Sequence, residues 1–181
     1  MNYCSQLYFP QKSSELAKIE NFQRIFTRKF PELAGMDYWQ RLKHLKMNSQ
    51  ERRMERYRVL YVWKILEGIS PNCGLEVAHS ERRGREVKIP PIKATGRIQS
   101  LRESSFQVHG PKLFNSLPQA IRNLQKISID DFKAKLDKYL ETIPDEPKLP
   151  NYISATCNQI TGNPSNSIVD HVTTERTRRP C

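Results

Sequence analysis

Side chains of the types that perform catalysis are sparse in this sequence of 181 residues. A polymerase centre needs carboxylates that converge on two Mg²⁺ ions, and Asp130 and Asp131 are the only adjacent aspartates. They follow Ser128, a residue type that caps helices. We therefore interpret them as acids of a first helical turn, where the helix dipole favours negative charge. The sequence predicts that the metal-holding centre of a polymerase is absent.

Nucleophilic and metal-dependent chemistry is also poorly represented. Cys73 and His79 could supply two metal ligands, whereas a structural zinc site takes four. The four cysteines contain no CxxC pair, which favours a reducing compartment. None of the motifs GxSxG, GxxxxGK[ST] and GxGxxG occurs. We predict no enzymatic activity, no metal and no cofactor for this chain.

Basic side chains are the remaining candidates for function. The chain carries 30 Lys and Arg against 19 Asp and Glu, a net charge of +11. Residues 1–70 hold 13 basic and 7 acidic side chains and residues 71–110 hold 7 and 4, so nine of the eleven excess charges precede Pro111. Such an excess favours a polyanionic partner, with nucleic acid ahead of an anionic membrane.

Lysine and arginine on helix faces bind phosphates by charge, without reading the base sequence. The alternative is a solvated helix face whose cations have acidic partners three or four residues away, such as Glu51 and Glu55. The candidate nucleic-acid-binding residues are Arg24, Arg28, Lys29, Arg41, Lys43, Lys46, Arg52, Arg53 and Arg56.

Three helices are expected to position these cations. The spacing of Leu16, Ile19, Phe22, Phe26 and Phe30 predicts a helix over residues 14–30 with one apolar stripe, which Pro31 ends. Asp37 with Gln40 predicts a capping box for a short second helix. The longest helix is expected from Ser49 to Glu67, with Asn48 and Glu51 as its cap and Gly68 as its stop.

Aromatic residues of that longest helix offer two interpretations. Tyr57, Tyr61 and Trp63 could stack nucleic-acid bases. Their helical spacing beside Leu60 and Ile65 instead favours a role in the core, and we prefer that interpretation.

Glycine and proline interrupt the pattern between residues 72 and 110. Short extended pieces are expected at residues 87–89, 98–101 and 106–108, with a hairpin as an option. We expect a turn at Gly110–Pro111, with His109 beside it as a loop residue.

Helical periodicity returns over residues 111–143. Pro118 suits the first position of one helix, and Ser128 caps the next, with Asp131 as its reciprocal partner. Ile129, Phe132, Leu136, Leu140 and Ile143 form the apolar stripe of that second helix. From Pro144 onward prolines break a run of Ser, Thr and Asn without apolar periodicity, so residues 145–181 are expected to be largely disordered.

An ordered series of segments along residues 3–170 resembles one protein class. The segments are YCSQL (3–7), ENFQRIFTRKFP (20–31), YWQRLKHLKM (38–47), ERRMERYRVLYVWKILEG (51–68), PNCG (71–74), LRESSFQVHGPKLFNSLP (101–118), FKAKLDKYL (132–140), IPDEP (143–147) and GNPSNSIVD (162–170). They resemble the C-terminal region, thumb and beyond, of reverse transcriptases from non-LTR (LINE-type, jockey-like) retrotransposons. In that family the catalytic aspartates lie in the preceding palm.

The resemblance implies a catalytically incomplete fragment of an RNA-directed DNA polymerase that grips a template–primer duplex. It implies a mainly α fold. A basic helical thumb-like bundle (1–70) would be followed by an irregular, β-containing connector (71–110), a helical pair (111–144) and the disordered tail (145–181). The alternatives are a protein-interaction module, which self-associates through apolar surface such as Tyr3, Leu7, Tyr8 and Phe9, and a transposon remnant without a role.

The expected location is inside the cell, nuclear or cytoplasmic. Met1–Pro10 lacks the charged-then-apolar layout of a signal peptide, so we do not expect secretion. No stretch of about 18 apolar residues occurs, so no membrane partner is expected.

Overall fold

The computed structural model describes residues 10, 13–80, 84–146, 149 and 167–169. The apolar residues Tyr3, Leu7, Tyr8 and Phe9 and most of the tail predicted to be disordered lie outside these ranges. Among the described residues no helix combines the length and the apolar content needed to cross a membrane.

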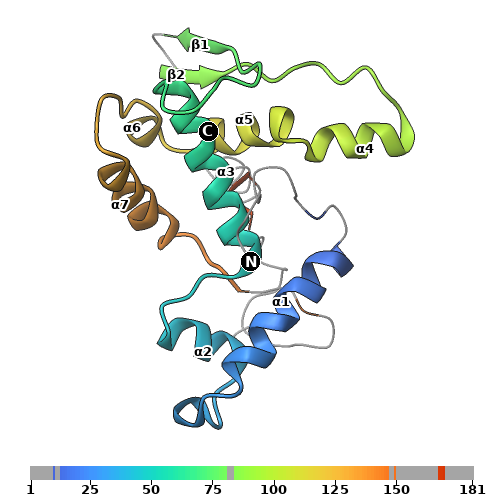
Figure 1. Cartoon of the computed structure of the whole chain (residues 1–181), viewed down its shortest axis with the longest axis vertical. Helices are drawn as coiled ribbons and strands as arrows, with labels where there is room; N and C mark the ends of the chain where they lie inside the picture. Colours follow the sequence, from blue (N-terminus) through green and yellow to red (C-terminus); the bar gives the residue numbers. More distant parts are fainter. Residues whose placement is uncertain (1–9, 11–12, 81–83, 147–148, 150–166, 170–181) are drawn as a thin grey trace, which may run out of the picture.

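Helices dominate the described residues, which confirms the predicted fold class (Figure 1). Along the sequence, a two-stranded sheet lies between the N-terminal helices and the C-terminal ones. In chain order the elements are α1 (Ser13–Thr27), the 3-10 turn η1 (Pro31–Leu33), α2 (Tyr38–His44), α3 (Gln50–Leu66), β1 (Val77–Ser80), β2 (Gly84–Val87), α4 (Gly96–Ser104), α5 (Phe106–Ser116), α6 (Gln119–Arg122) and α7 (Ile129–Leu140).

Helix α3 is the central element around which the others are arranged (Figure 1). Its C-terminal half builds the main core, where Trp63 is fully buried and stacks on Phe132 of α7 with ring centroids 4.4 Å apart. The Trp63 Nε1–H donates a hydrogen bond to the Leu124 carbonyl at 3.0 Å. Tyr57 and Tyr61 pack against the same core while partly buried. The preference for a core role of these three aromatics is confirmed.

Helix ends follow the predicted chemistry with two corrections. One is that Pro118, predicted at the first helical position, is the N-cap of α6 instead. Asp37 and Gln40 form the capping box of α2, and Ser128 caps α7 while its hydroxyl bonds the Asp131 carboxylate at 2.7 Å. The prediction that Asn48 caps α3 is wrong. Ser49 is the cap, because its Oγ accepts from the Arg52 N–H at 3.2 Å.

The orientation of α1 differs from the prediction. The three phenylalanines of the expected apolar stripe face solvent, with Phe22, Phe26 and Phe30 exposed by 62%, 59% and 40%. Its first two residues, Leu16 and Ile19, are partly buried. The buried side is mostly polar and consists of Ala17, Glu20, Gln23 and Thr27. Hydrogen bonds explain this choice, because Glu20 accepts from the Gln50 N–H at 2.7 Å. The side-chain amide of Gln23 also donates to the Asn48 carbonyl at 3.0 Å.

The middle segment contains the optional hairpin and more helix than expected. Strands β1 and β2 pair antiparallel, with Val77 opposite Val87. Residues 98–101 and 106–108 lie in α4 and α5, so the prediction of extended pieces there is wrong. Helix α5 also runs across the boundary expected between residues 110 and 111.

Gly110 and Pro111 lie inside α5, which corrects the predicted turn. A Cβ atom at Gly110 would lie 3.0 Å from Cγ2 of Val62, so the glycine permits close packing of α5 on α3. His109 belongs to the same helix, and its Nδ1 lies 3.1 Å from Nη1 of the buried Arg58.

Candidate nucleic-acid interface

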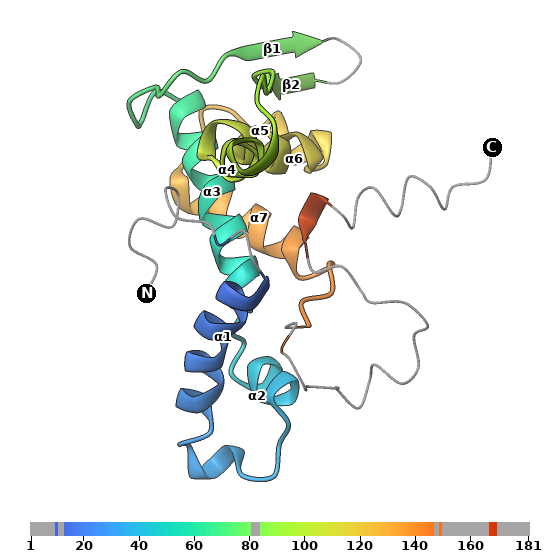
Figure 2. The same cartoon turned by 90° about the vertical axis from the view of Figure 1, so that its right-hand side faces the viewer.

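Six of the nine predicted nucleic-acid-binding residues line two separate pockets. One pocket is lined by residues of α1, of α2 and of the segment between them, and Figure 2 shows these two helices at the lower end of the molecule. The other lies between α3 and α7. The remaining three residues, Lys29, Lys43 and Arg52, line neither of these pockets.

The first pocket, which we call the arginine pocket, is defined by Arg24 of α1, Arg28 in the turn directly after α1, and Arg41 of α2. It has a volume of about 260 Å³ and its lining is completed by Met36, Asp37 and Tyr38. A neighbouring hollow of about 500 Å³ shares Arg28 and Arg41. The lining thus contains three arginines and one aspartate, which gives it an excess of positive charge.

Local sequence explains how the arginine pocket is built. Arg28 follows the last residue of α1, and its N–H donates to the Arg24 carbonyl at 3.2 Å, which keeps the two arginines one turn apart on the same side. Asp37 starts α2 and fixes its first turn by accepting from the Gln40 N–H at 2.8 Å. Arg41 follows one turn later, 6% exposed, with its guanidinium 5.6 Å from the centroid of the Tyr38 ring.

Such a site suits phosphate groups chemically. Guanidinium groups keep their charge at all physiological pH values and donate two parallel hydrogen bonds to phosphate oxygens. Two exposed lysines belong to the same elements as the arginine pocket: Lys29 follows α1, and Lys43 lies in α2. The Lys43 ammonium lies 4.7 Å from the centroid of the Trp39 ring.

The second pocket, between α3 and α7, is less favourable for anions. Lys46, Arg53 and Arg56 line a space of about 370 Å³ together with Asp137 and Glu141. Nη2 of Arg56 lies 2.7 Å from Oδ2 of Asp137, and this hydrogen bond raises the pKa of Arg56 above its ordinary value. The two carboxylates offset two of the three cations. We therefore place the stronger anion site at the arginine pocket.

Arg52 does not belong to any surface. It is 1% exposed, its Nη2 donates to the Pro144 carbonyl at 3.0 Å, and its Nε lies 3.8 Å from Oδ1 of Asp145. Its predicted role in binding phosphates is corrected to one in the interior. The sequence pattern predicted an exposed position because several arginines follow one another at the start of this helix. The segment that covers Arg52 begins 92 residues later in the chain, so no local pattern reveals it.

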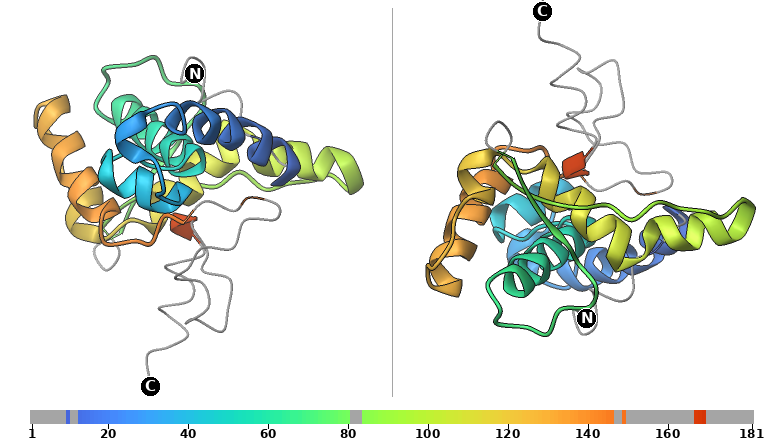
Figure 3. Two further views of the ribbon diagram at one scale, coloured as in Figure 1. Left: turned by 90° about the horizontal axis from the view of Figure 1, so that it is seen from below. Right: turned by 90° about the horizontal axis from the view of Figure 1, so that it is seen from above.

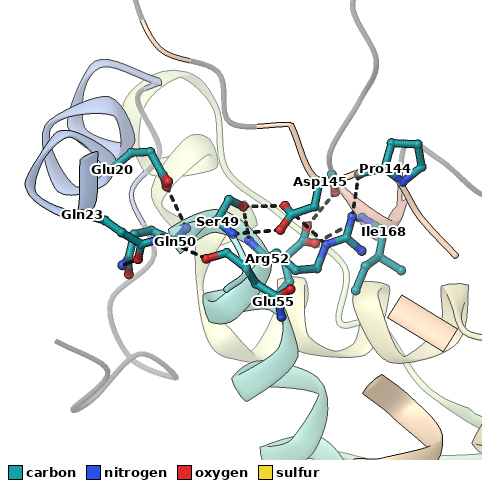
Figure 4. Close-up of polar contacts among 11 residues, drawn as sticks. Glu20, Gln23, Ser49, Gln50, Arg52, Glu55, Pro144, Asp145 and Ile168 are labelled. Atoms are coloured by element: carbon teal, nitrogen blue, oxygen red, sulfur yellow. Dashed lines mark hydrogen bonds and ion pairs between the residues drawn. The ribbon is translucent and has the colours of Figure 1, made fainter. Parts of the chain in front are cut away.

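Sequence reasoning missed a buried carboxylate network around the first turns of α3 (Figure 4). Glu20, Glu55 and Asp145 are its acids, and each is at most 9% exposed. Asp145 accepts from the Ser49 N–H at 2.8 Å and from the Ser49 hydroxyl at 2.6 Å. Glu55 accepts from the Ser167 hydroxyl at 2.8 Å and the Ile168 N–H at 3.2 Å. Asp145, Ser167 and Ile168 belong to the tail predicted to be disordered, and for these residues that prediction is wrong, because the network ties them to α3 and its cap.

Burial dominates the electrostatics of these acids. It raises the pKa of Glu55 to about 8, and it also raises the pKa values of Glu20 and Asp145 above their ordinary values. The hydrogen bonds to each carboxylate act in the opposite direction and are outweighed. No periodicity in the sequence marks these residues, because their partners lie on separate elements.

Metal chemistry finds no support in the described ranges, where no group of three or more His, Cys, Asp and Glu residues is placed to hold an ion. The interpretation of Asp130 and Asp131 as first-turn acids is confirmed. Asp130 lies 2.9 Å from the Lys133 ammonium, which lowers the pKa of this carboxyl, and Asp131 bonds the Ser128 cap.

Comparisons with protein-family models, with curated proteins and with solved structures found no match to this chain. The resemblance to non-LTR reverse transcriptases therefore stays a prediction. The geometry of the cationic residues is the remaining basis for a functional proposal.

Proposed function

We propose that this chain is a thumb-like, catalytically incomplete fragment of a retrotransposon reverse transcriptase that binds nucleic-acid backbones without sequence specificity. The observation that carries the proposal is the convergence of Arg24, Arg28 and Arg41, from α1, the turn after it and α2, on one pocket. The positive charge concentrated before Pro111 and the family resemblance support it.

The proposed mode of binding is electrostatic. The arginine pocket takes one phosphate, and Lys29 and Lys43 contact neighbouring phosphates of the same backbone. Each neutralised phosphate releases condensed counterions, so affinity falls as salt rises. With these three phosphates contacted on a duplex, the slope of log K against log salt is about −2.7, which corresponds to about a 40-fold loss between 50 and 200 mM salt.

Fluorescence anisotropy of a labelled duplex over that salt range tests the proposal. Lys29→Ala removes one phosphate contact and should reduce the slope by about 0.9. Arg28→Ala removes one of the three guanidinium groups around the pocket phosphate, so it should weaken binding with a smaller change in slope. Lys88→Ala is the matched control, because it changes the net charge equally at an exposed site whose ammonium pairs with Glu76 at 2.9 Å. A flat salt response, or equal losses in all three variants, would contradict the proposal.

A protein-interaction module is the second candidate, and α4 is the observation that favours it. None of the nine residues of α4 is buried, and Ile98 and Leu101 are exposed by 59% and 54%. Figure 3 shows α4 at one side of the molecule and α7 at the opposite side. Two exposed apolar side chains three residues apart on one helix invite a partner or a second copy. Light scattering after size exclusion tests the second case, which predicts a mass above 21.2 kDa that falls in an Ile98→Ala/Leu101→Ala variant.

A further inference from the structure

Three phenylalanines form an exposed aromatic row along α1 and the turn that follows it. Phe22 and Phe26 lie one helical turn apart, and the ring of Phe30 meets that of Phe26 edge-to-face, with centroids 5.4 Å apart. We call these residues the phenylalanine stripe. All three are at least 40% exposed, whereas large aromatic side chains of a folded chain are normally buried for most of their surface.

The outward direction of the stripe is fixed by the opposite face of the helix. Glu20 and Gln23 are buried and hydrogen-bonded to the start of α3, and the Tyr38 hydroxyl also donates to Glu20. Figure 4 shows Glu20 and Gln23 directed from α1 toward α3. If α1 were rotated to bring the phenylalanines inward, these hydrogen bonds would break and apolar rings would take the place of the buried polar side chains. The stripe is therefore a stable surface feature of this fold.

Lysines flank the exposed rings of Phe22 and Phe26 in the sequence. Lys18 lies four residues before Phe22, on the same face of α1 as the stripe. Lys29 lies in the turn after α1, where its N–H donates to the Phe26 carbonyl at 3.1 Å. Both lysines are exposed. Arg28 lies next to Lys29 in sequence and lines the arginine pocket. The surface thus runs from one lysine across aromatic rings to a second lysine and then to guanidinium groups.

Charge favours a polyanion over a second copy on this surface. Residues 13–30 carry four basic and two acidic side chains, and one of the acids, Glu20, is buried. A symmetric pairing of two stripes would bring both sets of cations together, which is unfavourable. A nucleic-acid strand presents the faces of its bases to the rings and the phosphates of its backbone to the cations, so it satisfies both components of the surface.

The spacing of the rings selects unpaired bases. One helical turn separates Phe22 and Phe26 by about 6 Å along the helix axis. Stacked nucleotides of one duplex strand are only about 3.4 Å apart, and their faces are covered by neighbouring bases. We propose that the phenylalanine stripe stacks unpaired bases of a single-stranded nucleic acid whose phosphates follow Lys18, Lys29 and the arginine pocket. This inference rests on the proposed function, because it assumes that the chain binds nucleic-acid backbones.

Paired binding measurements test the inference on the full chain. The probes are a labelled oligothymidylate of about 15 nucleotides and a blunt duplex of the same length at low salt. The Phe22→Ala/Phe26→Ala variant should bind the single strand about 30-fold more weakly than the wild type, the lower end of what two stacked bases contribute. Its affinity for the duplex should change by less than about twofold, because duplex binding uses charge alone.

A matched control is the Ile98→Ala/Leu101→Ala variant, which removes similarly exposed apolar side chains from α4. It should bind both probes as the wild type does. Circular dichroism of both variants should match that of the wild type, since the four substituted side chains are all more than half exposed.

The possible results separate this inference from the proposed function. Wild-type single-strand affinity in the Phe22→Ala/Phe26→Ala variant, with duplex binding retained, overturns the inference and leaves the proposed function standing. Absence of binding to either probe by the wild type overturns both. A wild-type dimer that becomes monomeric in this variant assigns the stripe to a second copy and overturns the inference. Sedimentation with phosphatidylserine vesicles in the absence of oligonucleotide binding assigns the stripe to a membrane surface and likewise overturns it.

Discussion

Replacing Glu55 by glutamine should make the protein more stable at pH 8 and remove a specific pH dependence. Burial raises the pKa of Glu55 from 4.5 to about 8, so the folded chain keeps a proton that the unfolded chain loses above pH 4.5. Protons bound preferentially by the folded state stabilise it. The contribution is fully present below pH 4.5 and is lost as the pH rises toward 8. Glutamine mimics the protonated acid and should abolish this loss.

The size of the effect follows from linkage between proton binding and folding. One proton taken up only by the folded state changes stability by about 1.4 kcal/mol per pH unit. Between pH 6.5 and 8 the expected loss is about 2 kcal/mol, a substantial part of a typical total of about 5–15 kcal/mol. For a domain of this size it corresponds to a decrease in Tm of about 4–8 °C.

The choice of pH window matters because His109 acts in the opposite direction. Burial lowers the pKa of His109 to about 4, below its ordinary value of 6.5. Its contribution to stability is present above pH 6.5 and is lost as the pH falls toward 4. Below pH 6.5 the two groups therefore partly cancel, whereas above it the slope from Glu55 remains. Glu20 and Asp145, whose pKa values are also raised, act in the same direction as Glu55.

Urea unfolding at pH 6.5, 7.25 and 8 measures this slope as a change in midpoint at constant m value. The wild type should lose stability across the series, and Glu55→Gln should show a reduced loss. Glu32→Gln, at an exposed carboxylate, is the matched control and should keep the wild-type slope. The reasoning is refuted if wild-type stability is constant or rises over this range, or if Glu55→Gln retains the full slope.

Three further predictions concern packing and are all measured by urea unfolding. Trp63→Ala should cost about 3–5 kcal/mol, because it empties a fully buried site and removes a hydrogen bond; a loss below about 1 kcal/mol would contradict the described core. Gly110→Ala should cost up to about 2 kcal/mol, since the added Cβ lies 3.0 Å from the buried Val62 and such overpacking costs about 1–3 kcal/mol, of which the higher helix propensity of alanine offsets about 1 kcal/mol; a stabilised variant would show that α5 is not pressed against α3. A double-mutant cycle on Arg56→Ala and Asp137→Ala should give a coupling of only about 0.5–1 kcal/mol, because the two side chains are 18% and 42% exposed and solvent screens the pair.

Elements with local signals were predictable from the sequence. Ser128 and Asp131 cap α7, and Asp37 and Gln40 cap α2, because each cap depends on groups three residues apart. The stripe of α7 was also predicted, and Phe132 is fully buried as expected. In these places local propensity and tertiary packing favour the same arrangement.

Errors arose where distant partners decide the outcome. Gly110 and Pro111 look like a turn, yet close contact with Val62 makes the glycine useful inside a helix, and the packing of α5 outweighs the hydrogen bond that the proline removes. The candidate site was affected in the same way. Arg24, Arg28 and Arg41 could be named from charge, but their convergence depends on how α1 and α2 pack, and no spacing in the sequence encodes that.

The reversed orientation of α1 connects the fold to the proposed function. A periodic apolar stripe normally supplies the buried face of a helix, but here Glu20 and Gln23 provide polar contacts that a second apolar face could not satisfy. Once they dock on α3, the phenylalanines must face outward and Arg24 and Arg28 must lie toward α2. The same contacts therefore determine both the exposed rings and the arginine pocket. A chain that exposes three phenylalanines lacks the stability that burying those rings would contribute. Such an arrangement is most readily kept where the exposed rings bind a partner.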